Sequence, residues 1–250
     1  MPTDLSTRAV HAGRHDFVAK GIHAPPIDLS STYPTPGRDA AARSYDALAA
    51  GDAAQGSNVY ARLYNPTTDR FEHALAELEG AEDAVCFASG MAALTAVLLA
   101  AKSRGAHVVA TRPIYGGSDH LLAHGLLGTE VTWAAPDAVA AAIRPDTGLV
   151  LIETPANPTL DLVDIADVVR QAGHVPVCVD STFATPVLQR PLAHGAALVL
   201  HSATKFLGGH GDVLAGVVAG PHAHIARLKH LRAITGGVLH PLASYLLHRG

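Results

Sequence analysis

From residue 66 onward the chain alternates short apolar runs with longer stretches whose apolar residues recur every three or four positions. The short runs predict buried strands and the longer stretches predict helices. The predicted strands are 84–87, 107–110, 131–133, 149–152, 175–179, 198–200 and 213–218, and the predicted helices are 66–79, 89–99, 116–127, 137–143, 162–172 and 222–233. Strands that alternate with helices indicate βαβ units around a mainly parallel sheet.

Residues 1–60 have a different pattern. They are rich in Pro, Gly, Ser and Asp, with Ala-Pro-Pro-Ile at 24–27 and Tyr-Pro-Thr-Pro-Gly at 33–37. Proline fixes φ and removes a backbone donor, so this segment is predicted to be an extended arm with turns and one short helix within 40–50. We expect an N-terminal arm over 1–60 that lies on another surface, such as a partner subunit, and an α/β domain over 61–250.

Composition excludes several classes of function. The apolar fraction of 48% and the charged fraction of 16% predict a large core. The net charge of −4 offers no basic excess for binding nucleic acid or an anionic membrane. The longest apolar stretch, 91–101, is too short to span a bilayer, and the first residues lack the apolar core of a signal peptide. A soluble cytoplasmic protein is therefore expected.

Cysteine and histidine do not indicate a metal site. Cys86 and Cys178 fall within predicted strands and are expected to be inert core thiols, because two cysteines without a CxxC pair form neither a disulfide framework nor a structural zinc site. His222 and His224 have no carboxylate or thiolate to complete a ligand set, so they are expected to lie on a solvated helix.

Polar residues follow several predicted strands directly, and these are the informative positions. Ligands of parallel α/β sheets bind beyond the carboxyl ends of the strands, so residues at these ends are expected around one crevice. The residues are Asn157, Asp180, Ser202, Thr204 and Lys205.

Two of these residues suggest covalent chemistry. A lysine at a strand end before a glycine-rich loop, as at Lys205, is expected to be partly desolvated, and such an amine forms a Schiff base with an aldehyde. Asp180 is either a helix cap or a buried acid that faces a cation. Ser202 and Thr204 precede the lysine at alternating positions, where they are turn residues or phosphate donors.

The remaining parts are an anion site and an aromatic ring. Gly90 and Met91 follow Ser89 at a predicted helix start, where free N–H groups and the helix dipole attract phosphate. Tyr115 stands at another strand-to-helix junction, where it either packs in the core or stacks on a ligand. An amine, an acid, a phosphate cradle and an aromatic plate are the parts that pyridoxal 5'-phosphate (PLP) requires.

The chain resembles the Cys/Met-metabolism family of PLP-dependent enzymes from about residue 5 to 250. This family includes cystathionine γ-synthase, cystathionine γ-lyase, cystathionine β-lyase, methionine γ-lyase and O-acetylhomoserine sulfhydrylase. The motif that carries the resemblance is 201–205 followed by 208–212. It is joined in the same order by 6–11, 60–62 with 65–67, 89–91, 115–117, 153–158, and 183–186 with 188–191.

The resemblance implies a role for each matching residue. Lys205 would be the Schiff-base lysine and proton shuttle, and Asp180 would pair with the pyridinium. Tyr115 would stack on the ring and handle protons at the leaving group, and Asn157 would bind the ring hydroxyl. The phosphate would be held by Gly90, Met91, Ser202 and Thr204 of one subunit and by Tyr60 and Arg62 of its neighbour. These roles imply a homotetramer built from active dimers.

The implied fold is the large domain of a fold-type-I PLP-dependent transferase with an extended N-terminal arm. Family members have a C-terminal small domain that carries the arginine for the substrate carboxylate, and that domain is expected to be absent from this chain. Ser181 stands where the family commonly has asparagine, and Gly117 stands where methionine γ-lyases usually have cysteine.

The implied activity is γ-elimination from a sulfur amino acid, methionine or L-cystathionine, as a carbon–sulfur lyase in methionine metabolism and transsulfuration. The products would be 2-oxobutanoate, ammonia and a thiol. The alternative is γ-replacement, as in cystathionine γ-synthase or an O-acylhomoserine sulfhydrylase, and these residues do not separate the two. A second alternative is a catalytically inactive scaffold that binds PLP or oligomerises.

Overall fold

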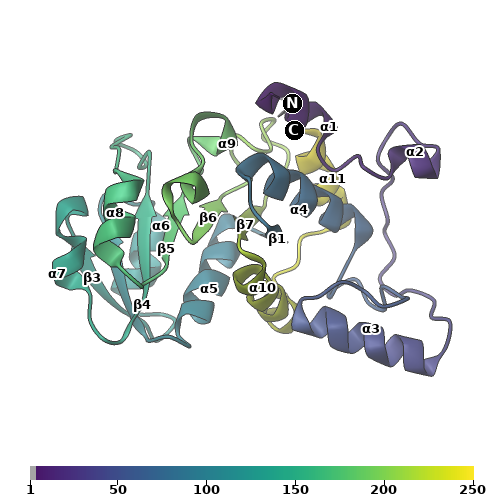
Figure 1. Cartoon of the computed structure of the whole chain (residues 1–250), viewed down its shortest axis with the longest axis horizontal. Coiled ribbons are helices and arrows are strands. Elements are labelled where there is room, and N and C mark those ends of the chain that lie inside the picture. The colour runs from purple at the N-terminus through teal and green to yellow at the C-terminus, as the bar shows by residue number, and fades with distance from the viewer. Residues whose placement is uncertain (1–3) are drawn as a thin grey trace.

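A computed structural model describes residues 4–250 of the chain, and its centre is a seven-stranded sheet (Figure 1). The strand order is β1-β7-β6-β5-β4-β2-β3. The strands are β1 (Asp83–Phe87), β2 (His107–Thr111), β3 (Glu130–Ala134), β4 (Thr147–Glu153), β5 (Val177–Asp180), β6 (Leu198–His201) and β7 (Gly216–Gly220). Neighbouring strands are parallel except at β7, which is antiparallel to both β1 and β6. The predicted mainly parallel sheet is confirmed.

Helices cover both faces of this sheet. The helices are α1 (Leu5–His11), α2 (Phe17–Lys20), α3 (Arg38–Ala50), α4 (Pro66–Glu79), α5 (Gly90–Ala101), α6 (Gly116–Ala123), α7 (Val139–Ala142), α8 (Ile165–Ala172), α9 (Thr185–Leu188), α10 (His222–Thr235) and α11 (Pro241–Arg249). Short 3₁₀ turns lie at η1 (Pro136–Ala138) and η2 (Pro191–His194). No described helix has the length and apolar character needed to cross a membrane.

Alternate strand residues supply the two cores. On one face, Val108 and Leu151 join a cluster with α5, α6 and α10. On the other face, Val109 and Ile152 pack with α7 and α8, and Cys86 lies in a separate cluster with α4 and α11. Because successive side chains of a strand point to opposite faces, an apolar run buried on both sides is what a covered parallel sheet needs.

Local sequence explains where the main helices begin and end. The Asn65 side chain accepts hydrogen bonds from the N–H groups of Thr67 and Thr68 at 3.0 and 3.2 Å, and Pro66 occupies the first helical position of α4. Gly80 ends α4 in the left-handed conformation, with φ 70°. Ser89 caps α5 by accepting a hydrogen bond from the Ala92 N–H at 3.1 Å.

Several elements differ from the sequence prediction. The helix predicted at 116–127 ends at Ala123, and the one at 162–172 begins only at Ile165. The strand predicted at 213–218 is shifted to β7. Three short helices (α1, α2 and α9) and the nine-residue α11 were not predicted, because few apolar residues repeat within so short a span.

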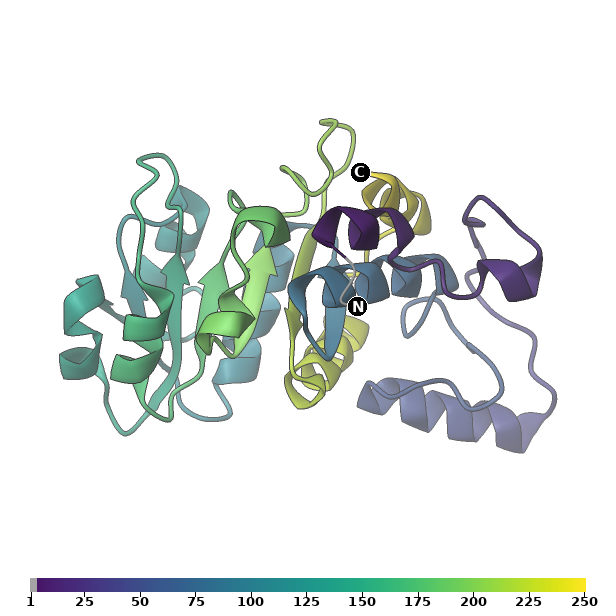
Figure 2. The same cartoon turned by 45° about the horizontal axis from the view of Figure 1, so that its top comes forward.

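The arm is more structured than its composition indicates, and it lies on its own chain. Helix α3 packs against α10, and α1 packs against α4, beside α11 (Figures 1 and 2). The buried guanidinium of Arg70 in α4 forms two hydrogen bonds to the Asp16 carboxylate, at 2.7 and 2.8 Å. A contact of the arm with a partner subunit stays a prediction, as does the division at residue 60.

Candidate active site

Asp180 ends β5 with one carboxylate oxygen bound and the other free. Its Oδ1 accepts the Thr182 N–H at 3.0 Å and the Thr182 hydroxyl at 2.5 Å. Its Oδ2 makes no hydrogen bond among residues 4–250. Burial raises the pKa of Asp180, and the bonds from Thr182 partly offset this effect. A half-buried carboxylate with a free oxygen is suited to receive a cation.

Thr182 also joins β5 to β6, a role that was not predicted from the sequence. Its Oγ1 accepts the Ser202 N–H at 2.8 Å while it donates to Asp180. One hydroxyl therefore sets the position of the acid relative to the strand end that carries Ser202. The sequence did contain a sign of this contact. An Asp-x-Thr spacing is typical of a turn in which the Asp side chain bonds the second following residue.

Gly90 brings the start of α5 against the end of β6. A Cβ at position 90 would lie 2.9 Å from the Ser202 Cβ and 3.1 Å from its Oγ, so only glycine allows this approach. The Gly90 and Met91 N–H groups have no hydrogen-bond partner within residues 4–250. Together with the dipole of the twelve-residue α5, they form an anion site next to the Ser202 hydroxyl.

Lys205 lies in the loop that follows β6, and its amine is free. Its N–H donates to the Ser202 carbonyl at 3.1 Å, and its carbonyl accepts the Gly209 N–H at 2.8 Å. The side chain is exposed, and its Nζ has no partner in the described part of the chain. The expectation of partial burial is therefore wrong for the Lys205 side chain in the single chain, although Leu207 in the same loop packs against α11.

Thr204 anchors the lysine loop to the strand beside it. Its hydroxyl donates to the Ala215 carbonyl at 3.1 Å and accepts the Ala215 N–H at 3.0 Å, and its own N–H also reaches that carbonyl. The hydroxyl proton of Thr204 is therefore already donated to the Ala215 carbonyl. The role of Thr204 as a phosphate donor stays a prediction.

Tyr115 precedes α6 beside Met91 and Gly117. The side chain is 46% exposed, so it does not pack in the core. A Cβ at Gly117 would lie 2.6 Å from the Tyr115 ring and 3.2 Å from the Met91 Sδ. Glycine at 117 therefore leaves room for the ring. The half-buried Asn157 follows β4, and its side-chain amide has no partner among residues 4–250.

Glu153 connects Tyr115 to Asn157, a role that was not predicted from the sequence. It is 5% exposed; its Oε2 accepts the Tyr115 N–H and its Oε1 accepts the Asn157 N–H, both at 2.7 Å. Burial, together with the negative charge of Asp180, raises the pKa of Glu153 to about 7. The two acids pair in register at the ends of β4 and β5.

In the single chain, Arg62 contacts α10 and lies beside Tyr60. The Arg62 guanidinium donates to the Ala233 carbonyl near the end of α10 and lies 5.3 Å from the Tyr60 ring centroid. Val59, just before them, has a φ of 57°, an unfavourable conformation for a β-branched residue. No hydrogen bond joins either side chain to the residues around Asp180 and Gly90.

The sequence profile described as Cys/Met metabolism PLP-dependent enzyme matches residues 6–250. The chain belongs to this family. The cofactor expected from the strand-end residues is thus the cofactor of the family, and the resemblance noted in the sequence is confirmed.

Among curated relatives, the L-methionine gamma-lyase of Streptomyces avermitilis is 61% identical over 98% of this chain and 60% of its own length. The L-methionine gamma-lyase of Brevibacterium sandarakinum is 58% identical over 98% of this chain and 63% of its own length. The chain therefore spans about three fifths of these relatives.

Solved structures of the family have the same fold. Cystathionine gamma synthase from Xanthomonas oryzae, in complex with aminoacrylate and cysteine, is 35% identical, with a TM-score of 0.87 over 100% of this chain and 63% of its own. The metB structure from Corynebacterium glutamicum is 32% identical, with a TM-score of 0.86 over 99% and 63%. The predicted fold class is confirmed.

The residues of this chain fit the family's cofactor. Unpaired N–H groups at the start of α5 suit a phosphate. Any Cβ at position 90 would fill the space between the start of α5 and Ser202. The free Oδ2 of Asp180 suits a protonated ring nitrogen, and the free amine of Lys205 suits an aldehyde. All three lie at the carboxyl edge of the sheet, where the topology predicts a ligand.

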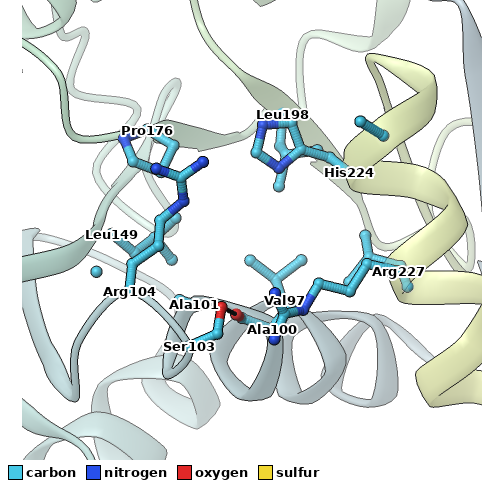
Figure 3. A pocket seen from close by; sticks show the side chains of 13 residues that line it. Val97, Ala100, Ala101, Ser103, Arg104, Leu149, Pro176, Leu198, His224 and Arg227 are labelled. Atoms are coloured by element: carbon cyan, nitrogen blue, oxygen red, sulfur yellow. Dashed lines mark hydrogen bonds between the residues drawn. The ribbon is translucent and has the colours of Figure 1, made fainter.

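A groove of about 180 Å³ lies at the opposite edge of the sheet and contains none of these residues (Figure 3). It is lined where β4, β5 and β6 begin, at Leu149, Pro176 and Leu198, with Arg104 and His224 among its polar residues. Burial, together with the charges of Arg104 and Arg227, lowers the pKa of His224. The groove therefore belongs to a different part of the molecule from the candidate active site.

Both cysteines are fully buried and unpaired, and burial raises the pKa of each thiol. This placement confirms the prediction of core thiols. His222 lies 3.2 Å from the Asp83 carboxylate, and within residues 4–250 no group of three or more metal-binding side chains is found.

Proposed function

We propose that this protein is a PLP-dependent carbon–sulfur lyase that performs γ-elimination on a sulfur amino acid, methionine or L-cystathionine. The observation that supports it most directly is the free Lys205 amine, on the same sheet edge as the free Asp180 Oδ2 and the unpaired N–H groups of α5. The identity of 58–61% to L-methionine gamma-lyases over 98% of the chain supports this choice of reaction.

The bound cofactor would supply an aldehyde that joins an amine and a ring that accepts electrons from the α carbon of the substrate. The Lys205 amine would hold that aldehyde and would move the proton at the α carbon of the substrate. Asp180 keeps the ring nitrogen protonated, because an anion beside it favours the charged form. The N–H groups of Gly90 and Met91, together with Ser202 and Thr204, hold the phosphate.

The other residues orient the ring and assist departure of the thiol. Tyr115 stacks on the ring and donates a proton to the leaving sulfur, and Asn157 binds the ring hydroxyl. After loss of a β proton, the electron pair left at the β carbon would form a double bond to the γ carbon as the carbon–sulfur bond breaks. With methionine the products are methanethiol, 2-oxobutanoate and ammonia, with water consumed.

The active unit is a dimer within a homotetramer, in a cytoplasmic enzyme. Tyr60 and Arg62 contact the phosphate of the neighbouring subunit. Within residues 4–250 the Arg62 guanidinium bonds only the Ala233 carbonyl, which leaves it without a role in the crevice of its own chain and supports this arrangement. The positive φ of Val59 supports it as well. Light scattering with the cofactor bound should give a mass of four chains.

The second candidate is γ-replacement, in which a second thiol captures the substrate after departure of the first group. It is favoured by the TM-scores of 0.86 and 0.87 to metB and to a cystathionine gamma synthase. The two reactions share the roles of Lys205, Asp180 and Tyr115, so the products must distinguish them.

The test is product analysis of the purified protein with methionine, cystathionine and an acylated homoserine plus cysteine. Release of 2-oxobutanoate from the first two supports elimination, and formation of cystathionine from the third supports replacement. A protein that binds PLP but converts none of them is the inactive scaffold. Borohydride reduction and peptide mapping should place the cofactor on Lys205, and a label elsewhere contradicts the proposal.

A further inference from the structure

Glu153 joins two segments that are far apart in the sequence and adjacent in the site. Tyr115 follows β2, and Asn157 follows β4, the neighbouring strand. The backbone N–H of each residue donates to a different oxygen of this one carboxylate, at 2.7 Å in both cases. The Glu153 carboxylate therefore determines the separation of the two residues that would flank the cofactor ring.

The carboxylate is also costly to bury, which indicates a purpose beyond packing. Glu153 is 5% exposed and has no cationic partner among residues 4–250. Asp180 lies beside it in register, so two acids share one edge of the sheet. By contrast, the buried Glu72 is paired with Arg232 at 2.5 Å and accepts the Cys86 N–H at 2.7 Å. An unpaired buried acid is retained more readily at a functional site than in an ordinary core.

We propose that Glu153 is a positioning residue, which holds Tyr115 and Asn157 at the spacing that the PLP ring requires through its two backbone hydrogen bonds. The inference rests on the proposed function, because it assumes that these two residues contact the cofactor. It extends that function to a residue that would touch neither the cofactor nor the substrate.

Only a carboxylate of this length satisfies both N–H groups. In Glu153→Gln the side chain keeps its size, but its amide nitrogen is a donor and so faces one N–H group without accepting from it. In Glu153→Asp an ionisable carboxyl group beside Asp180 is kept, but a side chain shorter by one methylene does not span both groups. The two variants therefore separate the bridge from the charge.

The experiment titrates PLP into the apoprotein of the wild type, Glu153→Gln, Glu153→Asp and the control Glu72→Gln. It records the dissociation constant, the circular dichroism of the cofactor's visible band and the Tm. We expect both Glu153 variants to bind PLP about tenfold more weakly, the factor for loss of about 1.4 kcal/mol, and to show altered cofactor dichroism. Glu72→Gln should lower the Tm but leave both cofactor readouts within about twofold of wild type.

Three outcomes overturn the inference while leaving the proposed function intact. One is wild-type affinity and dichroism in Glu153→Gln. The second is wild-type behaviour in Glu153→Asp, because charge rather than the bridge would then matter. The third is an equal loss in Glu72→Gln, which would trace the effect to general destabilisation. Failure of the wild type to bind PLP would instead overturn the proposed function, and the inference with it.

Discussion

The strand-end crevice and the segment around Tyr60 and Arg62 belong to one predicted site. In the single chain, however, their side chains have different kinds of hydrogen-bond partner. In the crevice, Asp180 and Ser202 are joined through Thr182 by hydrogen bonds of 2.5–2.8 Å. Arg62 instead contacts the carbonyl of Ala233 in α10. The topology of the sheet is enough to bring strand ends of one chain together. A residue that comes from a neighbouring subunit is instead positioned by the interface between subunits. The crevice should therefore respond to substitution in any assembly state, and Arg62 only in the oligomer.

The largest effect on cofactor binding is expected from Lys205→Ala. Without the Nζ amine no covalent bond to the aldehyde forms, so the visible band of the bound cofactor should be lost, together with all activity. Absorption spectroscopy and borohydride labelling measure this directly. Because the side chain is exposed, the Tm of the apoprotein should remain close to that of wild type. A retained band would show that another amine holds the cofactor.

Gly90→Ala should have the next largest effect. The new Cβ would lie 2.9 Å from the Ser202 Cβ, so α5 must move away from β6 and the anion site must widen. We expect PLP or inorganic phosphate to bind about tenfold more weakly, as for the loss of about 1.4 kcal/mol, measured by calorimetry. The control is Gly37→Ala, where a Cβ meets nothing within 4 Å. Equal affinities in the two variants would contradict the proposal that the close approach at Gly90 shapes the phosphate site.

Arg62→Ala should weaken PLP binding by a few-fold to about tenfold, the range for one half-buried charge-assisted contact. This loss should appear only when the oligomer is intact. This dependence is tested by PLP titrations at protein concentrations above and below the dissociation constant of the oligomer. Arg38→Ala, at an exposed position in α3, is the matched control. Unchanged affinity at high concentration would argue against a role for Arg62 across the interface.

Asp16→Asn should leave PLP affinity unchanged and act on stability alone. Hydrogen bonds from Arg70 and Lys20 hold the pKa of Asp16 well below its ordinary value of 3.8. A depressed acid pKa stabilises the fold at pH values above 3.8 and loses that contribution as pH falls further. At neutral pH the variant should lose about 2 kcal/mol, measured by denaturant unfolding. This difference should shrink in acid, and a constant difference would exclude the ion pair as its source.

Much of the crevice was predictable because strand ends and helix caps are local features. The apolar run before Asp180, Ser89 before Gly90, and Lys205 ahead of its glycines are all contiguous in the chain. Once parallel strands were predicted, their carboxyl ends had to meet at one edge. Glu153 was missed because its partner Tyr115 lies 38 residues away, and a glutamate at a strand end carries no local mark of that contact.

The order of apolar and polar positions in this chain was enough to define a covered α/β sheet, its carboxyl edge and the chemistry gathered there, because backbone periodicity and capping act over a few residues. Folding in three dimensions settled the antiparallel course of β7, the packing of the arm against α4 and α10, and the exposure of Lys205. It also created the bridges through Thr182 and Glu153. Such features depend on pairings between distant segments, and their energies arise only when those segments meet.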